Sequence, residues 1–467
     1  MLTHCVRTQV FFLRRPKMPS PLPCRFTNPL QFWRDCASLP SDTGDTDHIK
    51  TFIELCSDRY YIIRDTRNWD SFRRGINCRY GPLGMELRKG MLDKWWASVV
   101  MSRAQVFGIS TMHLTRTTSA TAESTLKLVE SNALDCTVNQ KGLPWDQARD
   151  TLKRQLQGSP TVRTNLLQGA LEQYLSSLEL VNRRLPFGLA ETGVCYQALE
   201  EQTNGPGCPA EFTQASLVWF CSPRTSSQWL DYWARQRLQW WRKFALGPSS
   251  FSCSDVSDGE EGERASRGVR ILYHFPWGAE PLETLWNLGD AELLQTHKGS
   301  RAKLQCRDGR KSVVPHVISV SGNVDRGVLA YLHNSLQEIR KTDSKQRLHK
   351  RKVLKLHPSL APVKVALDMG RGPTVDLRQV CEGLLQELLE GGITAWPGYL
   401  ETMPSSMEQL NTKYDEMGVL FTIAITDGTL ESGLVLVRSR DTTIKETMHI
   451  SKVKAFLAKY ISASENI

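Results

Sequence analysis

The chain has 467 residues and a mass of 52.9 kDa, so two or three separate cores are expected. Hydrophobic residues make up 40% and charged residues 23%, which is ordinary globular composition and excludes a mostly disordered or fibrous chain. No stretch of about eighteen residues is apolar enough to predict a membrane-spanning helix. The nearest, residues 95–102, is followed by Arg103.

The twelve cysteines form no CxxC pair and match no zinc-binding Cys/His spacing. We interpret them as reduced thiols that mostly serve as packing residues. The pattern predicts neither a disulfide framework nor a metal site.

The first 34 residues are strongly basic. They contain six Lys and Arg side chains and no carboxylate, with an apolar run at residues 10–13 between the arginines. This composition is typical of an amphipathic mitochondrial transit segment, which we place with its linker at residues 1–47. A disordered basic tail is the alternative. Folded structure is expected to begin near His48.

Two further basic segments lie in the middle of the chain. Residues 298–311 hold six basic residues against Asp308, and residues 340–355 hold eight against Asp343. Such clusters can neutralise phosphates and bind nucleic acid in a salt-sensitive way, although many charge runs are simply solvated loops. The predicted DNA contacts are Lys298, Arg301, Lys303, Arg307, Arg310, Lys311, Arg347, Lys350, Arg351 and Lys352.

Before these segments the pattern predicts three structural elements. An apolar repeat over residues 167–181 predicts one amphipathic helix, and residues 251–267 predict a mobile acidic loop. Residues 228–245 predict a helix in which Trp229, Trp233 and Trp240 suggest either base stacking or core packing. Core packing is preferred, with the helix's arginines facing outward.

Residues 363–467 carry ten basic and fourteen acidic side chains. Strands are expected near 363–367, 393–396, 419–425 and 434–438, alternating with helices near 377–388, 406–416 and 451–460. Gly391 and Gly392 should end the first helix. This pattern predicts a compact α/β domain with a net acidic surface.

Several segments resemble the motifs of glycyl-tRNA synthetases, which have the class II synthetase fold. The first-motif region is similar to residues 79–87 (RYGPLGMEL), followed by Trp95 and Trp96. Residues 185–193 and 211–215 resemble the segments around the second motif, and residues 315–326 resemble the third. Residues 360–365, 413–418 and 437–441 resemble the family's anticodon-binding domain. The resemblance implies a class II synthetase-like α+β domain over 48–345, with an antiparallel sheet, and an α/β anticodon-binding-like domain over 346–467.

This chain departs from that family at positions that carry the chemistry of amino-acid activation. The second-motif pattern Phe-Arg-x-Glu is replaced by residues 196–199, where Gln197 and Leu199 stand at the charged positions. A neutral amide cannot supply the bidentate cation that steadies a reacting phosphate. Asn165 replaces the acidic residue of a pocket segment, and Arg326 of the third motif remains without its partners, so we interpret it as structural. Amino-acid activation is therefore not expected.

A synthetase scaffold without its ATP chemistry, with a basic leader and basic segments, resembles the family of accessory, or processivity, subunits of mitochondrial DNA polymerase gamma. That resemblance implies a non-catalytic homodimer in the mitochondrial nucleoid. It would bind double-stranded DNA and the catalytic subunit and raise polymerase activity and processivity, without cofactor or metal. It also implies a helical dimerisation insertion near residues 116–160, where Trp145, Ala148, Leu152 and Leu156 form one helical face.

The acidic C-terminal segment should repel DNA and is expected to dock the catalytic subunit through exposed strand edges. The predicted contacts are Leu434, Leu436, Arg438 and Arg440. Two alternatives stay open: a working mitochondrial glycyl-type synthetase, and a tRNA-binding module. Charge alone cannot separate DNA from RNA, because both present phosphates.

Overall fold

The computed structural model describes residues 43–63, 68–115, 126–138, 144–198, 209–256, 267–298, 301–342, 348–370, 373–401 and 406–465. A compact unit spans His48–Ile467. The first described helix, α2 (Thr43–Asp58), begins a few residues before the predicted start of folded structure. Within the described residues no helix has both the length and the apolar character needed to cross a bilayer.

The first-motif region forms helix α4 (Pro82–Trp96), which follows the short helix α3 (Asn68–Arg74). Proline at the first helical position suits a helix start, because its missing N–H has no partner there in any case. Leu83, Leu87, Met91 and Trp95 recur every four residues and are all buried. The helix continues into η1, one π-helical turn at Ala97–Met101.

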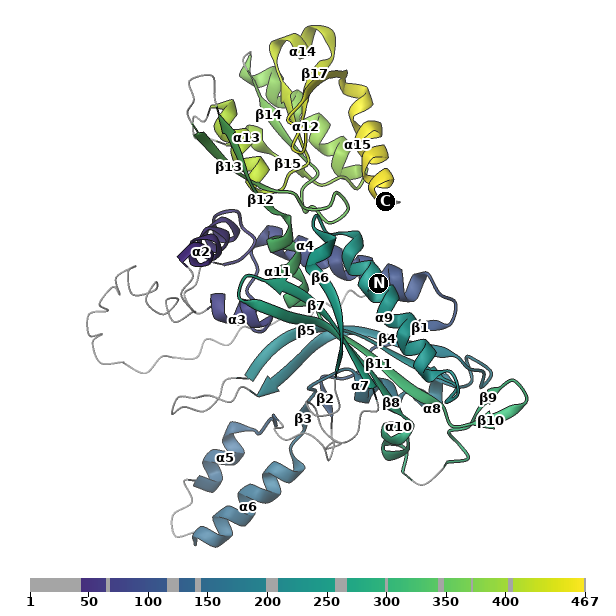
Figure 1. Ribbon diagram of the computed structural model, residues 1–467. Helices are drawn as coiled ribbons and strands as arrows, with labels where there is room; N and C mark the ends of the chain where they lie inside the picture. Colours follow the sequence, from purple (N-terminus) through teal and green to yellow (C-terminus); the bar gives the residue numbers. More distant parts are fainter. Residues whose placement is uncertain are drawn as a thin grey trace, which may run out of the picture. The chain divides into compact units, whose positions relative to one another are not determined.

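A seven-stranded sheet forms the centre of the synthetase-like part (Figure 1). Its neighbouring strands are antiparallel except for β1 and β4. In spatial order they are β1 (Val106–Gly108), β4 (Phe187–Ala198), β5 (Pro209–Cys221), β11 (His316–Asn323), β8 (Gly278–Gly289), β7 (Arg267–Phe275) and β6 (Phe251–Val256). The expected loop over 251–267 is therefore wrong at its start, because residues 251–256 form the edge strand β6. Residues 257–266 lie outside the described part.

Helices α4, α9 (Ser226–Lys243) and α11 (Val324–Ser335) cover one face of this sheet. Trp233 and Trp240 are buried, as predicted for core residues. The expectation that the arginines of this helix all face outward is wrong for Arg237, which is 2% exposed. It forms a buried ion pair with Glu283 on β8 at 2.9 Å, and this pair explains how a cation can lie in the core.

Shorter helices cover part of the opposite face. The apolar repeat predicted as one helix forms two, α7 (Leu167–Glu172) and α8 (Tyr174–Ser177), which are packed with α10 (Ala291–Thr296). Leu171, Tyr174 and Leu178 are fully buried against Phe187 and neighbouring side chains, so the predicted packing role is confirmed. The hairpin β9 (Cys306–Asp308) and β10 (Lys311–Val313) follows α10.

The helical insertion contains α5 (Ser131–Val138) and α6 (Trp145–Gly158). It is framed by the short antiparallel strands β2 (Leu114–Thr115) and β3 (Thr161–Val162). In Figure 1 the two helices project away from the sheet. No residue of α6 is buried, and the side chain of Trp145 is 76% exposed.

The antiparallel hairpin β12 (Leu336–Thr342) and β13 (Leu348–Leu354) leads into the C-terminal part and spans the predicted boundary at 345 and 346. A five-stranded sheet follows. Its order is β15 (Ala395–Trp396), β14 (Val365–Met369), β16 (Phe421–Ile425), β17 (Leu434–Ser439) and β18 (Lys445–His449). The first three strands are parallel and the last two are antiparallel.

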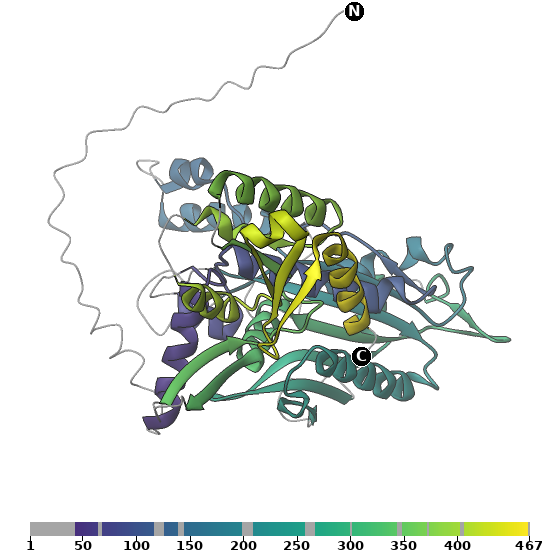
Figure 2. The ribbon, with the colours of Figure 1, turned by 90° about the horizontal axis from the view of Figure 1, so that it is seen from above.

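The remaining helices flank this sheet, and Figure 2 shows α12 and α15 beside its strands. Gly391 caps α12 and Gly392 has φ +71°, as the predicted helix end required. The helices are α12 (Thr374–Glu390), α13 (Met407–Glu416), α14 (Asp427–Ser432) and α15 (Ile450–Glu465), with short 3-10 turns η2 (Pro248–Ser250) and η3 (Gly398–Leu400).

The expectation of a free strand edge at residues 434–440 is wrong. β17 is hydrogen-bonded on both sides, to β16 and to β18, and the unpredicted strand β18 is the edge. Arg438 and Arg440 are 7% and 2% exposed. Only Leu434 and Leu436, at 43% and 38% exposure, present apolar surface from this strand.

Candidate nucleic-acid interface and degenerate activation site

The segments that resemble synthetase motifs meet on the seven-stranded sheet. The second-motif region is the antiparallel hairpin of β4 and β5, and the third is β11 with the start of α11. The first, α4, packs against α11. Residues far apart in sequence are thus brought to one sheet, as the resemblance implied.

The positions that lost their charges lie around one end of this sheet. Gln197 is exposed near the end of β4, opposite Ala210 of β5, and Leu199 lies outside the described residues. Asn165 is exposed, and its Oδ1 accepts a hydrogen bond from the backbone N–H of Leu167 at 3.1 Å, at the start of α7. Neither described side chain offers a charge to a phosphate or an amino group.

The charged residues left on this face pair with one another. Arg163 and Glu191 are 7% and 5% exposed, and their side chains form an ion pair at 3.0 Å. Arg163 also donates to the carbonyl oxygen of Val194 at 2.7 Å. The carboxylate of Glu191 further accepts bonds from the backbone N–H and the hydroxyl of Thr111, at 2.9 and 2.8 Å. Both ions are therefore satisfied within the chain.

The third-motif residues are similarly engaged. Asp325 accepts hydrogen bonds from the hydroxyl of Tyr80 at 2.8 Å and the backbone N–H of Thr213 at 2.6 Å, and pairs with Arg88 at 3.2 Å. Burial nevertheless raises the pKa of Asp325. Arg326 donates to the carbonyl oxygens of Pro281 and Arg74, at 2.7 and 2.8 Å. These bonds join separate segments and fit the structural interpretation of Arg326.

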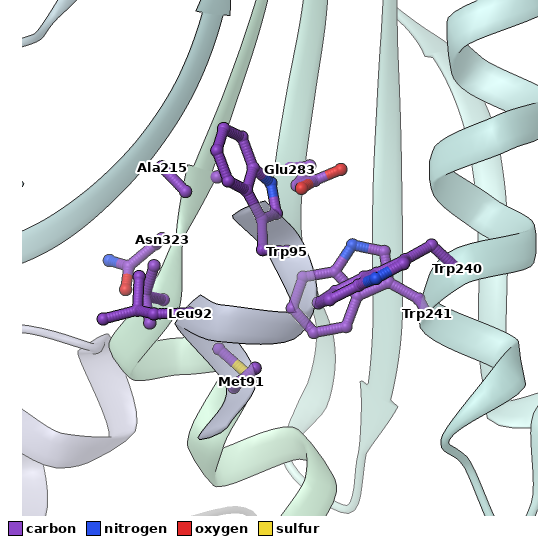
Figure 3. Close-up of a pocket in the computed structure, with 10 residues that line it drawn as sticks. Met91, Leu92, Trp95, Ala215, Trp240, Trp241, Glu283 and Asn323 are labelled. Carbon is purple, nitrogen blue, oxygen red and sulfur yellow. The ribbon is translucent and has the colours of Figure 1, made fainter. Parts of the chain in front are cut away.

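The helix-covered face of the sheet is densely filled. Figure 3 shows a small space between α4, α9 and the sheet, with Trp95 beside Glu283 and Trp240 against Trp241. Its volume is about 10 Å³, which is room for one water molecule at most. This space cannot hold a nucleotide or an amino acid.

An exposed basic surface lies beside the β9–β10 hairpin, which Figure 1 places near α8 and α10. Among the described residues, we define the basic lobe as the exposed side chains of Arg183, Arg184, Lys303, Arg307, Arg310 and Lys311. Within the described part of the chain, none of the six forms an ion pair with an acidic residue. The hairpin's acidic residue, Asp308, pairs instead with Arg224 at 2.8 Å, and this neighbour lowers the pKa of its carboxyl.

The chain fold joins the two halves of the basic lobe. A backbone bridge links Arg184 to Arg307, and the guanidinium of Arg183 donates to the carbonyl oxygen of Lys303 at 3.3 Å. Sequence reasoning missed Arg183 and Arg184, because more than a hundred residues separate them from the hairpin and no local pattern marks them. Of the other predicted contacts, Lys298 is exposed and Arg301 pairs with Asp290 at 3.3 Å.

In the second basic segment, the structure describes the side chains of residues 351–355 alone. Arg347 and the side chain of Lys350 lie outside the described part, and Lys352 is half-buried. The guanidinium of Arg351 forms an ion pair with the buried Asp415. Asp415 also receives a bidentate pair of bonds from Arg438, at 3.0 and 2.9 Å. The prediction of Arg351 as a phosphate contact therefore conflicts with its position, because its charge is already compensated.

Two other buried polar groups stabilise the C-terminal part. Arg440 donates to the carbonyl oxygens of Leu354, Leu356 and Gly418, at 3.1, 3.0 and 3.0 Å. Asp368 accepts a bond from the hydroxyl of Tyr414 at 2.7 Å, and burial raises the pKa of Asp368 to about 6. The guanidinium of Arg438 is bonded to Asp415 and that of Arg440 to these carbonyl oxygens. Both predicted contacts with the catalytic subunit are therefore engaged inside the chain.

The cysteines described in the structure are free thiols, as predicted. In the described part of the chain, no group of three or more His, Cys, Asp or Glu side chains is arranged to hold a metal ion.

The architecture defines the class of protein. A solved prolyl-tRNA synthetase from Cryptosporidium parvum, in complex with L-proline and AMP, aligns with a TM-score of 0.60 at 12% sequence identity, covering 89% of this chain and 75% of that one. Residues 362–460 match the family described as the anticodon binding domain. The fold is therefore that of a class II tRNA synthetase with an anticodon-binding domain, as expected.

Sequence comparison then gives the family. The DNA polymerase subunit gamma-2 of Bos taurus is 52% identical over 420 residues, which is 89% of this chain and 86% of the relative. The mitochondrial DNA polymerase subunit gamma-2 of Xenopus laevis is 50% identical over 92% of both chains. A glycine–tRNA ligase of Streptomyces coelicolor is 25% identical over 88% of this chain and 98% of that one. The chain belongs to the DNA polymerase subunit gamma-2 family.

Proposed function

We propose that this protein is a non-catalytic accessory subunit of the mitochondrial replicative DNA polymerase, which acts as a homodimer in the nucleoid. It binds double-stranded DNA and the catalytic subunit and thereby raises DNA affinity, activity and processivity. The observation that carries this proposal is the 50–52% identity, over about nine tenths of the chain, to relatives named DNA polymerase subunit gamma-2. The mitochondrial name of the Xenopus relative supports the location, and the basic leader supports a transit segment.

The proposed lack of catalysis is supported by the positions of the charges. Gln197 and Asn165 offer no ion, while Arg163 and Glu191 are bound to each other in the interior. A reacting phosphate needs donors aimed at the charge that develops in the transition state, and neither the neutral Gln197 nor the paired Arg163 supplies one at this end of the sheet. ATP–pyrophosphate exchange that depends on an amino acid should be absent.

The proposed DNA contact is the basic lobe. Its six side chains are exposed, and backbone contacts bring their two chain segments together. Neutralised phosphates release counterions, so the affinity should fall steeply with salt and depend little on base sequence. An accessory subunit acts on processivity by adding such contacts to a tethered complex, which lowers the rate of dissociation from the template.

The proposed dimer contact is the apolar face of α6. Trp145, Ala148, Leu152 and Leu156 lie on one side of this helix, and Leu156 is 46% exposed. An amphipathic helix without a buried residue needs a partner surface to stabilise it. A second copy of the chain is the proposed partner, and replacement of Trp145 and Leu156 by serine should shift the sedimenting species toward monomer.

The proposed dock for the catalytic subunit is in the acidic C-terminal part. Leu434 and Leu436 of β17 and Ile444, which is 57% exposed, supply apolar surface there. Serine at Leu434 and Leu436 should weaken stimulation of the polymerase, while serine at the equally exposed Leu389 on α12 should not.

Primer extension by the catalytic subunit, with and without this protein over a range of salt, tests the whole proposal. Stimulation should persist at salt concentrations where the polymerase alone leaves the template. A second candidate, a tRNA-binding module, is favoured by the anticodon-binding match at residues 362–460. Competition between a long DNA duplex and tRNA distinguishes the two, because preferential release of duplex by tRNA would support the second.

A further inference from the structure

A pocket with a volume of about 210 Å³ lies between helix α9 and the π-helical turn η1. It is much larger than the space that one water molecule needs. Six of its lining residues come from α9, between positions 233 and 243. The lining consists of Ser98, Arg103, Trp233, Gln236, Arg237, Gln239, Trp240 and Lys243.

The lining contains three cations and no acidic residue. Glu283 lies behind one of them and neutralises Arg237, with both of its oxygens within 3.2 Å of the Arg237 Nε. Arg103 and Lys243 have no such compensation, because neither has a carboxylate within ion-pair distance among the described residues. Arg103 donates instead to the hydroxyls of Ser102 and Tyr232, and Lys243 to the backbone oxygen of Glu465. The pocket therefore has an excess of positive charge.

Neutral groups line the same space. Gln236 and Gln239 add amide groups at the wall, and an amide NH2 can donate two hydrogen bonds. The guanidinium of Arg103 lies 4.7 Å from the centre of the Trp233 ring, so this cation rests on an aromatic face of the pocket. The pocket thus combines two cations that have no carboxylate partner with amide donors.

We infer that the α9 pocket binds a small phosphate-bearing anion of about the size of pyrophosphate. Phosphate oxygens are acceptors only, carry the charge that Arg103 and Lys243 lack, and form strong charge-assisted hydrogen bonds with such groups. The π-helical turn places Ser98 at the same wall, and π-helical turns in α-helices frequently mark functional positions. The site is separate from the basic lobe and does not depend on the proposed accessory role.

The pocket's tryptophans provide a direct readout. Inorganic pyrophosphate, inorganic phosphate and deoxyadenosine monophosphate are titrated separately into the full-length protein at constant ionic strength, with sulfate as the control anion. Binding is followed by tryptophan fluorescence and by calorimetry. Saturable binding of pyrophosphate, tighter than that of sulfate, is expected, and the nucleotide arm shows whether the phosphate enters free or attached to a nucleoside.

Two variants locate the ligand. Arg103→Gln combined with Lys243→Gln should weaken binding about tenfold or more, because two charge-assisted bonds are lost. Arg103→Lys combined with Lys243→Arg retains both charges and should bind within a few-fold of the original protein, which separates loss of the site from loss of the fold. Arg307→Gln with Arg310→Gln, in the basic lobe, should leave pyrophosphate binding unchanged.

Three results would overturn the inference: no saturable pyrophosphate binding in the millimolar range, equal binding by the double glutamine variant, or loss of binding in the basic-lobe variant. A crystal structure with pyrophosphate at another surface would do the same.

Discussion

The seven-stranded sheet and the basic lobe use the same kinds of charged side chain in opposite environments. Beside the sheet, Arg163 is buried and Arg326 is half-buried, and both are bonded to groups of the chain itself. In the basic lobe, Arg307 and Lys311 are exposed and remain available to an outside anion. A buried ion pair costs desolvation and stabilises one geometry, whereas an exposed cation contributes little to folding but can attract a polyanion. The comparison teaches that position, rather than residue type, separates a structural arginine from a binding one.

The strongest test of this difference removes one partner of a buried pair. Glu191→Ala leaves the guanidinium of Arg163 in the interior without its carboxylate, so the free energy of unfolding should fall by about 3–5 kcal/mol. Chemical denaturation measures this. Asp290→Ala, which removes the half-buried partner of the exposed Arg301, is the control and should cost under about 1 kcal/mol. If both variants lose a similarly small free energy of unfolding, the proposed difference between buried and exposed charges is wrong.

The converse test neutralises the basic lobe. Arg307→Gln, Arg310→Gln and Lys311→Gln together should leave the free energy of unfolding within about 0.5 kcal/mol. The slope of log affinity against log salt for duplex DNA should fall by about one unit for each residue. Glutamine at Lys445, Lys452 and Lys459 removes the same charge from the acidic C-terminal part. If this control variant weakens DNA binding as strongly as the basic-lobe variant does, the net charge alone determines the DNA affinity.

A buried carboxyl in the C-terminal sheet provides a pH test. The folded state raises the pKa of Asp368 from 3.8 to about 6, so it holds the proton more tightly than the unfolded chain does. The protein should therefore lose stability as the pH rises from about 4 to 6. Asp368→Asn removes this loss and should be more stable by about 1–3 kcal/mol above pH 6, with little difference below pH 4.

Urea denaturation across this pH range measures the effect, and Asp376→Asn on the exposed start of α12 is the control. Parallel stability curves for Asp368→Asn and the original protein would contradict the prediction.

The smallest expected effect concerns a residue that sequence reasoning assigned to DNA. Arg351→Gln should reduce the free energy of unfolding by about 1 kcal/mol, since Asp415 keeps its two bonds with Arg438. Affinity for duplex DNA should change less than twofold in a filter-binding or fluorescence assay. A loss like that of the basic-lobe variant would show that Arg351 leaves Asp415 to meet a phosphate.

Much of the fold could be predicted because local patterns and motif order agree with it. The alternating apolar residues of β14 and the glycines after α12 mark their elements without tertiary information. Strand β18 (KETMH) escaped prediction because it is an exposed edge with almost no apolar residue, so its pairing to β17 alone defines it. Because β18 was not predicted, β17 was wrongly expected to have a free edge.

The candidate site was predictable only in part. A run of basic residues indicates phosphate binding but not which of its members have an internal partner, and Asp415 lies 64 positions after Arg351. Arg183 and Arg184 show the opposite case, in which distant chain segments add charge to a predicted cluster. Arg237 was misplaced for the same reason, since its acceptor, Glu283, comes from another element.

The three bonds of Arg440 have a consequence for dividing this protein into pieces. The segment that matches the anticodon binding domain begins at residue 362, after Leu354 and Leu356, whose carbonyl oxygens receive two of those bonds. A fragment cut at 362 would keep the guanidinium in its interior and lose two of its four acceptors, with Gly418 and Asp441 remaining. The smallest autonomous C-terminal piece should therefore start ahead of β13, so the sequence homology boundary and the physical boundary of this domain differ.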